Sequence, residues 1–235
     1  MTASSDALYN HMIRACRQHL TGPPFPQNGW GVAVIDHLNL HRQSLHNVNH
    51  IGRKAPAMSQ ASALKGAILT ALFAAAAAAA GYLLMAIPNV ELFLLTLFAA
   101  GRTLGVTRGI SAALAASLLY FGLNPQGGLF PPLLISQMIG AIASPLAGAL
   151  WGRLSPNLWW RRLSAAILGA LTTLWYDIVT NLAYPLTAGF DMTQTGLTLV
   201  AGIPFAIIHI GSNTLIFFLL ALPLQTLIDR RNLSV

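Results

Sequence analysis

Charged residues are scarce in this sequence: lysine, arginine, aspartate and glutamate make up 8% of the 235 residues, whereas 55% are apolar. A soluble domain has about 25% charged residues, so the composition excludes an ordinary soluble domain and indicates a membrane protein. The few charges are mostly basic, 13 against 6 acidic residues, for a net charge of +7. Because they lie in loops between apolar segments, we assign them to a cytoplasmic membrane face and predict no nucleic-acid partner.

Cysteine and catalytic motifs are almost absent. Cys16 is the single cysteine, which excludes an intrachain disulfide and a CxxC metal or redox motif. No Walker, HExxH or GxSxG motif occurs, so the corresponding ATPase, metalloprotease and hydrolase chemistries are excluded. We expect no catalytic residue, no resident metal and no cofactor.

Residues 1–57 differ from the rest because they are polar and rich in proline, glycine and histidine. The pairs His37/His41 and His46/His50 have the i,i+4 spacing of a helical metal site, but no further ligand pattern accompanies them. We therefore predict a disordered cytoplasmic extension.

Met58 begins the part of the chain that we expect to fold. It leads directly into the first apolar segment, which makes it a candidate start of translation. Under this hypothesis residues 1–57 are an extension that is not translated. Residues 58–235 are predicted to form the membrane domain.

Long apolar segments predict membrane-spanning helices, each of which needs about 20 residues. The six predicted spans are residues 66–87, 89–101, 109–122, 132–152, 163–184 and 197–228. The second and third are short, so we expect them to be tilted, extended through their glycine-rich ends or shielded by protein. The predicted fold is an all-α integral membrane protein, a compact bundle of six transmembrane helices.

Basic residues predict the orientation of these spans. Lysine and arginine occur before span one, between spans two and three, between spans four and five, and after span six. The opposite loops contain neither residue. Because cytoplasmic loops carry the excess of lysine and arginine, we predict a multi-pass protein of a prokaryotic plasma membrane with both termini in the cytoplasm.

Stripes of small residues predict close contacts between helices, since small residues four apart allow another helix to approach. Span one carries one stripe at Ala71, Ala75 and Ala79 and an adjacent one at Ala74 and Ala78. Span four carries a stripe formed by Gly140, Ser144, Gly148 and Gly152. We expect internal packing for part of this set and consider Ala71, Ala75 and Ala79 a candidate docking surface for another membrane protein.

Polar residues within the apolar segments are the candidate functional site, because an ionisable group in hydrocarbon costs roughly 2.5–3.5 kcal/mol. Helical spacing places Asp177 and Asn181 on one face of span five, and His209 and Asn213 on one face of span six. The candidate ligand-binding residues are Asn89, Glu91, Gln137, Tyr176, Asp177, Asn181, His209 and Asn213. The predicted topology puts most of them in the outer half of the membrane, so we expect a pocket open to the outside. Each residue alone could instead serve helix packing, as in a pair of Asp177 with His209.

Several of these features follow one another in a characteristic order over residues 64–230. They are the stretch IPNVE at 87–91, the glycine-rich turn at 101–109, Gln137 on its small-residue helix, Tyr176 with Asp177, and His209 with Asn213. In order, spacing and size, this part of the chain resembles the substrate-binding S components of energy-coupling factor (ECF) vitamin transporters.

The resemblance implies a six-helix protein without catalytic activity that binds a vitamin or related micronutrient from outside the cell. It implies docking through Ala71, Ala75 and Ala79 onto a transmembrane T component that carries two cytoplasmic ATPases, followed by toppling of the S component in the membrane. The ligand stays open among a pterin, a flavin, a thiamin-like molecule and a corrin. Two other interpretations also stay open: an intramembrane enzyme with Asp177 and His209 as acid and base, and a structural scaffold.

Overall fold

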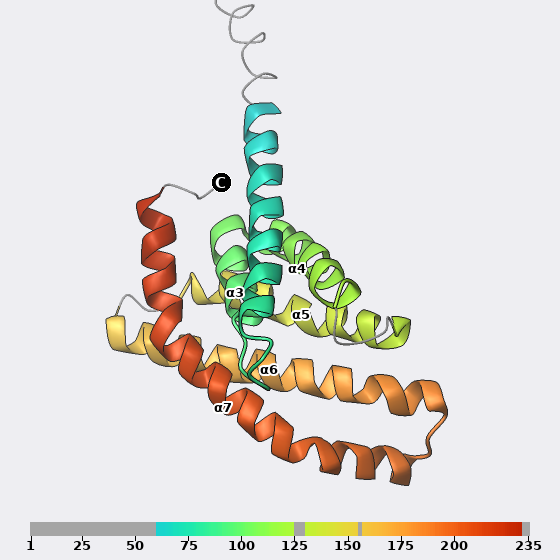
Figure 1. Ribbon diagram of the computed structural model, residues 1–235. Coiled ribbons are helices and arrows are strands. Elements are labelled where there is room, and N and C mark those ends of the chain that lie inside the picture. The colour runs from blue at the N-terminus through green and yellow to red at the C-terminus, as the bar shows by residue number, and fades with distance from the viewer. Residues whose placement is uncertain (1–59, 125–129, 155–156, 232–235) are drawn as a thin grey trace, which may run out of the picture. The chain divides into compact units, whose positions relative to one another are not determined.

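The computed structural model describes residues 60–124, 130–154 and 157–231, and within these ranges the chain is helical and has no strand (Figure 1). The helices are Gln60–Leu83, α3 (Phe93–Leu104), α4 (Val106–Gly122), α5 (Pro131–Trp151), α6 (Leu158–Ala188) and α7 (Met192–Arg230). Each predicted span falls on one of these helices, so the all-α prediction is confirmed for the described residues. The predicted disordered extension, residues 1–57, lies outside them.

Four helices are long and apolar enough to cross a membrane: Gln60–Leu83, α5, α6 and α7. This finding indicates a membrane protein. The apolar helices α3 and α4 are shorter, with 12 and 17 residues. At a rise of 1.5 Å per residue α3 is about 18 Å long, which is less than the hydrocarbon core of about 30 Å.

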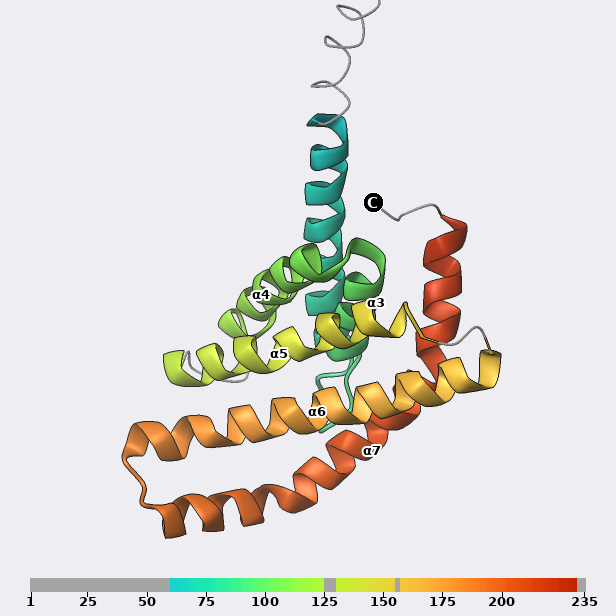
Figure 2. The same ribbon diagram turned by 180° about the vertical axis from the view of Figure 1, so that it is seen from behind.

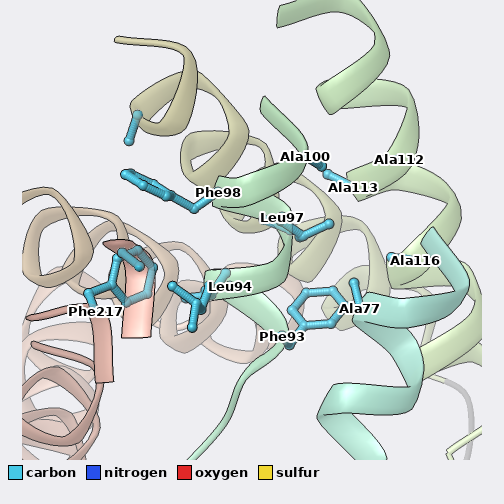
Figure 3. Packing of buried hydrophobic residues seen from close by; sticks show 14 of the residues in the cluster. Ala77, Phe93, Leu94, Leu97, Phe98, Ala100, Ala112, Ala113, Ala116 and Phe217 are labelled. Carbon is cyan, nitrogen blue, oxygen red and sulfur yellow. The ribbon is translucent and has the colours of Figure 1, made fainter. Parts of the chain in front are cut away.

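Other helices enclose α3, as expected for an apolar helix that is too short to span the hydrocarbon core. It contacts α4, α5, α6 and α7, and all its residues except Thr96 and Arg102 are buried. The ring centroid of Phe98 lies 5.2 Å from that of Phe217 on α7 and 5.4 Å from that of Trp151 on α5. Figure 3 shows α3 side chains filling the space between α4 and α7.

The small-residue stripe of α5 packs inside the protein. A Cβ atom on Gly148 would lie 1.9 Å from the backbone oxygen of Phe98, so only glycine permits this approach to α3. The hydroxyl of Ser144 donates a hydrogen bond of 2.6 Å to the backbone oxygen of Leu94. The two remaining glycines of the stripe face α6 and α3. The expectation of internal packing is therefore confirmed for this stripe.

The start of α3 differs from the prediction. The second span was expected from residue 89, but α3 begins at Phe93. Asn89 has a φ of 61°, in the left-handed region, and a right-handed helix does not continue through such a residue. Asn89 and Glu91 therefore lie in the loop that leads into α3, rather than on a helix.

Successive helices alternate in direction. Gln60–Leu83 runs in the same direction as α4. Near the starts of the two helices Gly66 packs against Arg108. Near their ends the Tyr82 hydroxyl donates a hydrogen bond of 2.9 Å to the Tyr120 backbone oxygen. α6 and α7 form an antiparallel hairpin that is visible in both views (Figures 1 and 2). In both views the start of Gln60–Leu83 and the end of α7 point toward the same side.

Basic residues gather where helices begin or end on one side of this alternating arrangement. Arg108 at the start of α4 packs against the first helix, and Arg102 at the end of α3 packs against the end of α5. The guanidinium of Arg161, near the start of α6, lies 4.9 Å from the ring centroid of Trp151 at the end of α5. The indole nitrogen of Trp151 also donates a hydrogen bond of 2.9 Å to the Arg161 backbone oxygen.

Candidate ligand-binding site

Three ionisable side chains meet in the interior of the described helices. On α7, His209 Nδ1 lies 2.7 Å from Asp177 Oδ1 on α6. The other imidazole nitrogen, Nε2, lies 3.5 Å from Glu91 Oε1 in the loop before α3. The exposed fractions of these side chains are 10% for His209, 12% for Asp177 and 15% for Glu91. The structure thus joins three predicted site residues in one buried group, here named the ionic cluster.

The turn between α6 and α7 sets the pairing of Asp177 with His209. α6 ends at Ala188 and is followed by Gly189, whose φ of 69° is left-handed. α7 begins with a capping box: the Asp191 side chain accepts from the Gln194 backbone N–H, and the Gln194 side chain accepts from the Asp191 backbone N–H. A short capped turn fixes the register of two antiparallel helices, so residues of α6 meet defined partners on α7.

Further polar contacts follow the same hairpin on both sides of the ionic cluster. One turn toward the start of α6, the Asn213 amide nitrogen donates to the Thr173 hydroxyl at 3.0 Å. One turn the other way, the Asn181 amide nitrogen donates to the backbone oxygen of Asp177 in its own helix, at 2.7 Å. A Cβ atom on Gly202 of α7 would lie 3.3 Å from the Asn181 amide oxygen. Asn181 and Asn213 therefore extend the polar face predicted from the sequence.

Aromatic rings adjoin the ionic cluster. The Tyr176 ring packs edge-on against the His209 imidazole, with 6.2 Å between centroids. On α4, Phe121 stacks on Tyr176 at 6.3 Å and also contacts Tyr120 at 4.6 Å. The side chain of Gln137 on α5 lies near Tyr176. Tyr176 and Gln137 are thus connected to the cluster, whereas sequence reasoning did not identify Phe121.

Asn89 is tied to the site through its backbone. The hydroxyl of Ser212 donates a hydrogen bond to the Asn89 backbone oxygen at 2.5 Å and one to the His209 backbone oxygen at 3.0 Å. This contact holds the loop that carries Glu91 against α7. Ser212 was missed by sequence reasoning, although its position three residues after His209 places it on the same side of the helix.

We expect Asn89→Gly to leave ligand affinity unchanged, because glycine keeps the left-handed φ and the backbone oxygen. Asn89→Val is expected to lower the free energy of unfolding by about 1–3 kcal/mol, since a β-branched residue is strained at this φ. Thermal unfolding and equilibrium ligand binding of both variants in neutral detergent measure these effects. Loss of binding in Asn89→Gly with unchanged stability would instead identify the side chain as a ligand contact.

Hydrogen-bond acceptors outnumber donors in the cluster and its surroundings. Glu91 Oε1, Asp177 Oδ2 and Asn213 Oδ1 are buried and have no hydrogen-bond partner among the described residues. Glu91 Oε1 is within ion-pair distance of His209, but without hydrogen-bond geometry. Leaving a buried polar atom unsatisfied costs about 1–3 kcal/mol. These oxygens are therefore suited to accept hydrogen bonds from a bound molecule.

The cluster does not have the arrangement of a metal site. No group of three His, Cys, Asp or Glu residues in the described part of the chain is placed to hold a metal ion. Each ring nitrogen of His209 faces a carboxylate, whereas a metal ligand needs a free imidazole nitrogen. The histidine pairs His37/His41 and His46/His50, for which we predict no metal site, lie outside the described residues.

The two alanine stripes of the first helix have different surroundings. Ala74 and Ala78 are buried, with exposed fractions of 2% and 5%. Ala71, Ala75 and Ala79 are exposed. The stripe predicted as a docking surface is thus uncovered in the described structure, and its docking role stays a prediction.

Comparisons of the chain with protein-family models, with curated proteins and with solved structures found no match.

Proposed function

We propose that this protein is the substrate-binding S subunit of an ECF-type importer, which captures a vitamin-like small molecule from outside the cell and has no catalytic activity of its own. The observation that carries the proposal is the buried cluster of Glu91, Asp177 and His209 with its unpartnered oxygens. Ionisable groups at membrane depth are rare and mark ligand or ion sites. Most buried polar groups in folded proteins are hydrogen-bonded, so the gathering of unsatisfied acceptors at this cluster supports ligand binding.

In this proposal all six helices lie in the plasma membrane and both termini lie in the cytoplasm. The alternating helix directions and the gathering of arginines at one side support this topology. Asp177 lies 19 residues after Leu158, the first residue of α6. At 1.5 Å per residue this is about 28 Å from the basic end of the helix, toward the outer face of a core of about 30 Å.

The contact between Asp177 and His209 also resembles an acid–base pair, which is the observation that favours an intramembrane enzyme. A general base, however, needs a nitrogen within reach of the proton that it abstracts. Here Nδ1 is paired with Asp177 at 2.7 Å, and Nε2 faces a second carboxylate of the protein, that of Glu91, at 3.5 Å. This geometry supports ligand binding rather than an enzymatic reaction at the cluster. Under the enzyme alternative, Asp177→Asn would abolish turnover and leave binding largely intact.

The proposal is tested by identifying what the protein binds. The protein is purified in mild neutral detergent from cells grown in rich medium, then denatured, and the released small molecules are identified by mass spectrometry. We expect one vitamin-like compound in stoichiometric amount. A protein that releases nothing, and that binds no member of a vitamin panel, would contradict the proposal and favour the scaffold interpretation.

The proposed partners are a transmembrane T component and two cytoplasmic ATPase subunits. The exposed stripe of Ala71, Ala75 and Ala79 is the proposed contact, because small side chains let the helix of a partner approach closely in lipid. Toppling of the docked S subunit would then deliver the ligand to the cytoplasm.

We expect Ala75→Leu to reduce recovery of the T component by about tenfold or more, which corresponds to ~1.4 kcal/mol. The larger side chain keeps the two helices apart, but it points away from the protein's own core and leaves ligand binding intact. Co-purification of co-expressed T and ATPase subunits measures docking. Ala115→Leu is the matched control, since Ala115 is an exposed alanine on α4. Equal recovery with both variants would exclude this stripe as the contact.

A further inference from the structure

We propose that the ligand presents a positively charged nitrogen group, an ammonium or amidinium attached to a flat ring, to Glu91, Asp177 and Asn213. This inference rests on the proposed function and specifies the substrate class of the same site. It follows from the charge, the hydrogen-bonding groups and the aromatic neighbours of the ionic cluster.

The charge of the cluster favours a cation. Glu91 and Asp177 contribute two carboxylates and share His209 as their partner. With a protonated imidazole the three side chains carry a net charge of −1, and with a neutral imidazole they carry −2. Both ion pairs of the cluster use His209, and neither includes a lysine or an arginine. In a medium of low dielectric constant this surplus of negative charge attracts a cation and opposes a carboxylate or phosphate.

The hydrogen-bonding groups of the cluster also favour a cationic ligand. In and beside the cluster, the buried side-chain atoms without a hydrogen-bond partner among the described residues are oxygens: Glu91 Oε1, Asp177 Oδ2 and Asn213 Oδ1. Two neighbouring amide donors are already engaged, since the Asn213 amide nitrogen donates to Thr173 and the Asn181 amide nitrogen donates to the Asp177 backbone. An ammonium or amidinium supplies several donors and accepts none. An anionic ligand would add acceptors where donors are needed.

The surroundings favour an organic cation over a metal ion. Tyr176 lies against the His209 ring and stacks on Phe121, so aromatic surface adjoins the carboxylates. Flat rings stack on such side chains, and cations are attracted to aromatic faces. No described group of three His, Cys, Asp or Glu residues is arranged for a metal.

Three probes of one shape and different charge test the inference on the full-length protein: benzamidine is the cation, benzamide the neutral analogue and benzoate the anion. Affinities are measured from the shift in thermal unfolding with probe concentration, in neutral detergent after removal of any endogenous ligand. We expect benzamidine to bind at least about tenfold more tightly than either analogue. Equal affinities, a preference for benzoate or benzamide, or no binding of benzamidine would overturn the inference.

Two variants test whether the ionic cluster causes the preference for a cationic probe. Glu91→Gln is expected to abolish the preference for benzamidine, because it removes one carboxylate of the cluster. Asp191→Asn removes a negative charge from the exposed start of α7 and keeps a good helix cap, so the preference should persist. If the preference also persisted in a folded Glu91→Gln protein, the cluster would not be its cause. If Glu91→Gln does not fold, the ranking of the three probes on the unmodified protein decides alone.

Identification of the natural ligand distinguishes a failure of this inference from a failure of the proposed function. A stoichiometric molecule with a cationic nitrogen at neutral pH would support both. A stoichiometric neutral or anionic molecule would overturn the charge inference and leave the S-subunit proposal intact. Recovery of no ligand, together with preferential binding of benzamidine, would support the charge inference and count against the proposed function.

Discussion

Replacing His209 with phenylalanine is expected to lower the free energy of unfolding by about 3–5 kcal/mol. The substitution removes the partner that Asp177 and Glu91 share, and it leaves two carboxylates buried together. A buried charge without a partner is far more costly than the loss of one hydrogen bond. Reversible unfolding in neutral detergent, followed by circular dichroism at the helical band, measures the change.

The combination of His209→Phe with Asp177→Asn and Glu91→Gln separates this cause from a simple packing defect. Removing a whole buried ionic group is often close to neutral, so the triple variant should recover most of the lost stability. If the three substitutions instead added their separate costs, the carboxylates would not be the source of the instability.

Gly148→Ala is expected to destabilise the protein by roughly 3 kcal/mol, at the upper end of typical overpacking costs. The added Cβ would lie 1.9 Å from the backbone oxygen of Phe98. Because this oxygen belongs to the backbone, it cannot rotate away as a side chain would, and α5 has to separate from α3. The same unfolding experiment in detergent measures the loss.

Gly196→Ala provides the control for Gly148→Ala. Gly196 lies in α7, and nothing is within 4 Å of the position that its Cβ would take. Alanine favours a helix over glycine by up to about 1 kcal/mol, so this variant should be equally stable or more stable. A Gly148→Ala protein that also keeps its stability would contradict the close approach of α3 and α5.

Hydropathy predicted the helices but not all their ends. α6 and α7 begin at Leu158 and Met192, several residues before the predicted spans, because helices extend past the apolar region where capping groups support them. Asn157 caps α6 by accepting from backbone N–H groups, and Asp191 caps α7. The late start of α3 follows from the left-handed Asn89. These ends depend on local backbone geometry, which hydropathy does not report.

Helical periodicity predicted which polar residues share a face, but not which atoms meet. The i,i+4 spacing placed Asp177 with Asn181, yet it could not show that Asn181 bonds the backbone of its own helix. The contact of Glu91 with His209 joins positions far apart in the sequence and depends on how the loop before α3 folds. In the first helix, spacing identified two alanine stripes, but only packing decided that Ala74 is buried and Ala75 exposed.

The most direct test of the central claim is the amount of endogenous ligand that co-purifies with three forms of the protein. Mass spectrometry after denaturation quantifies the released molecule for the unmodified protein, for Glu91→Gln and for Asp191→Asn. If the ionic cluster binds the ligand, the unmodified protein and Asp191→Asn will carry it in stoichiometric amount, whereas folded Glu91→Gln will be largely empty. Equal occupancy of all three forms would show that the ligand binds elsewhere and would contradict the account.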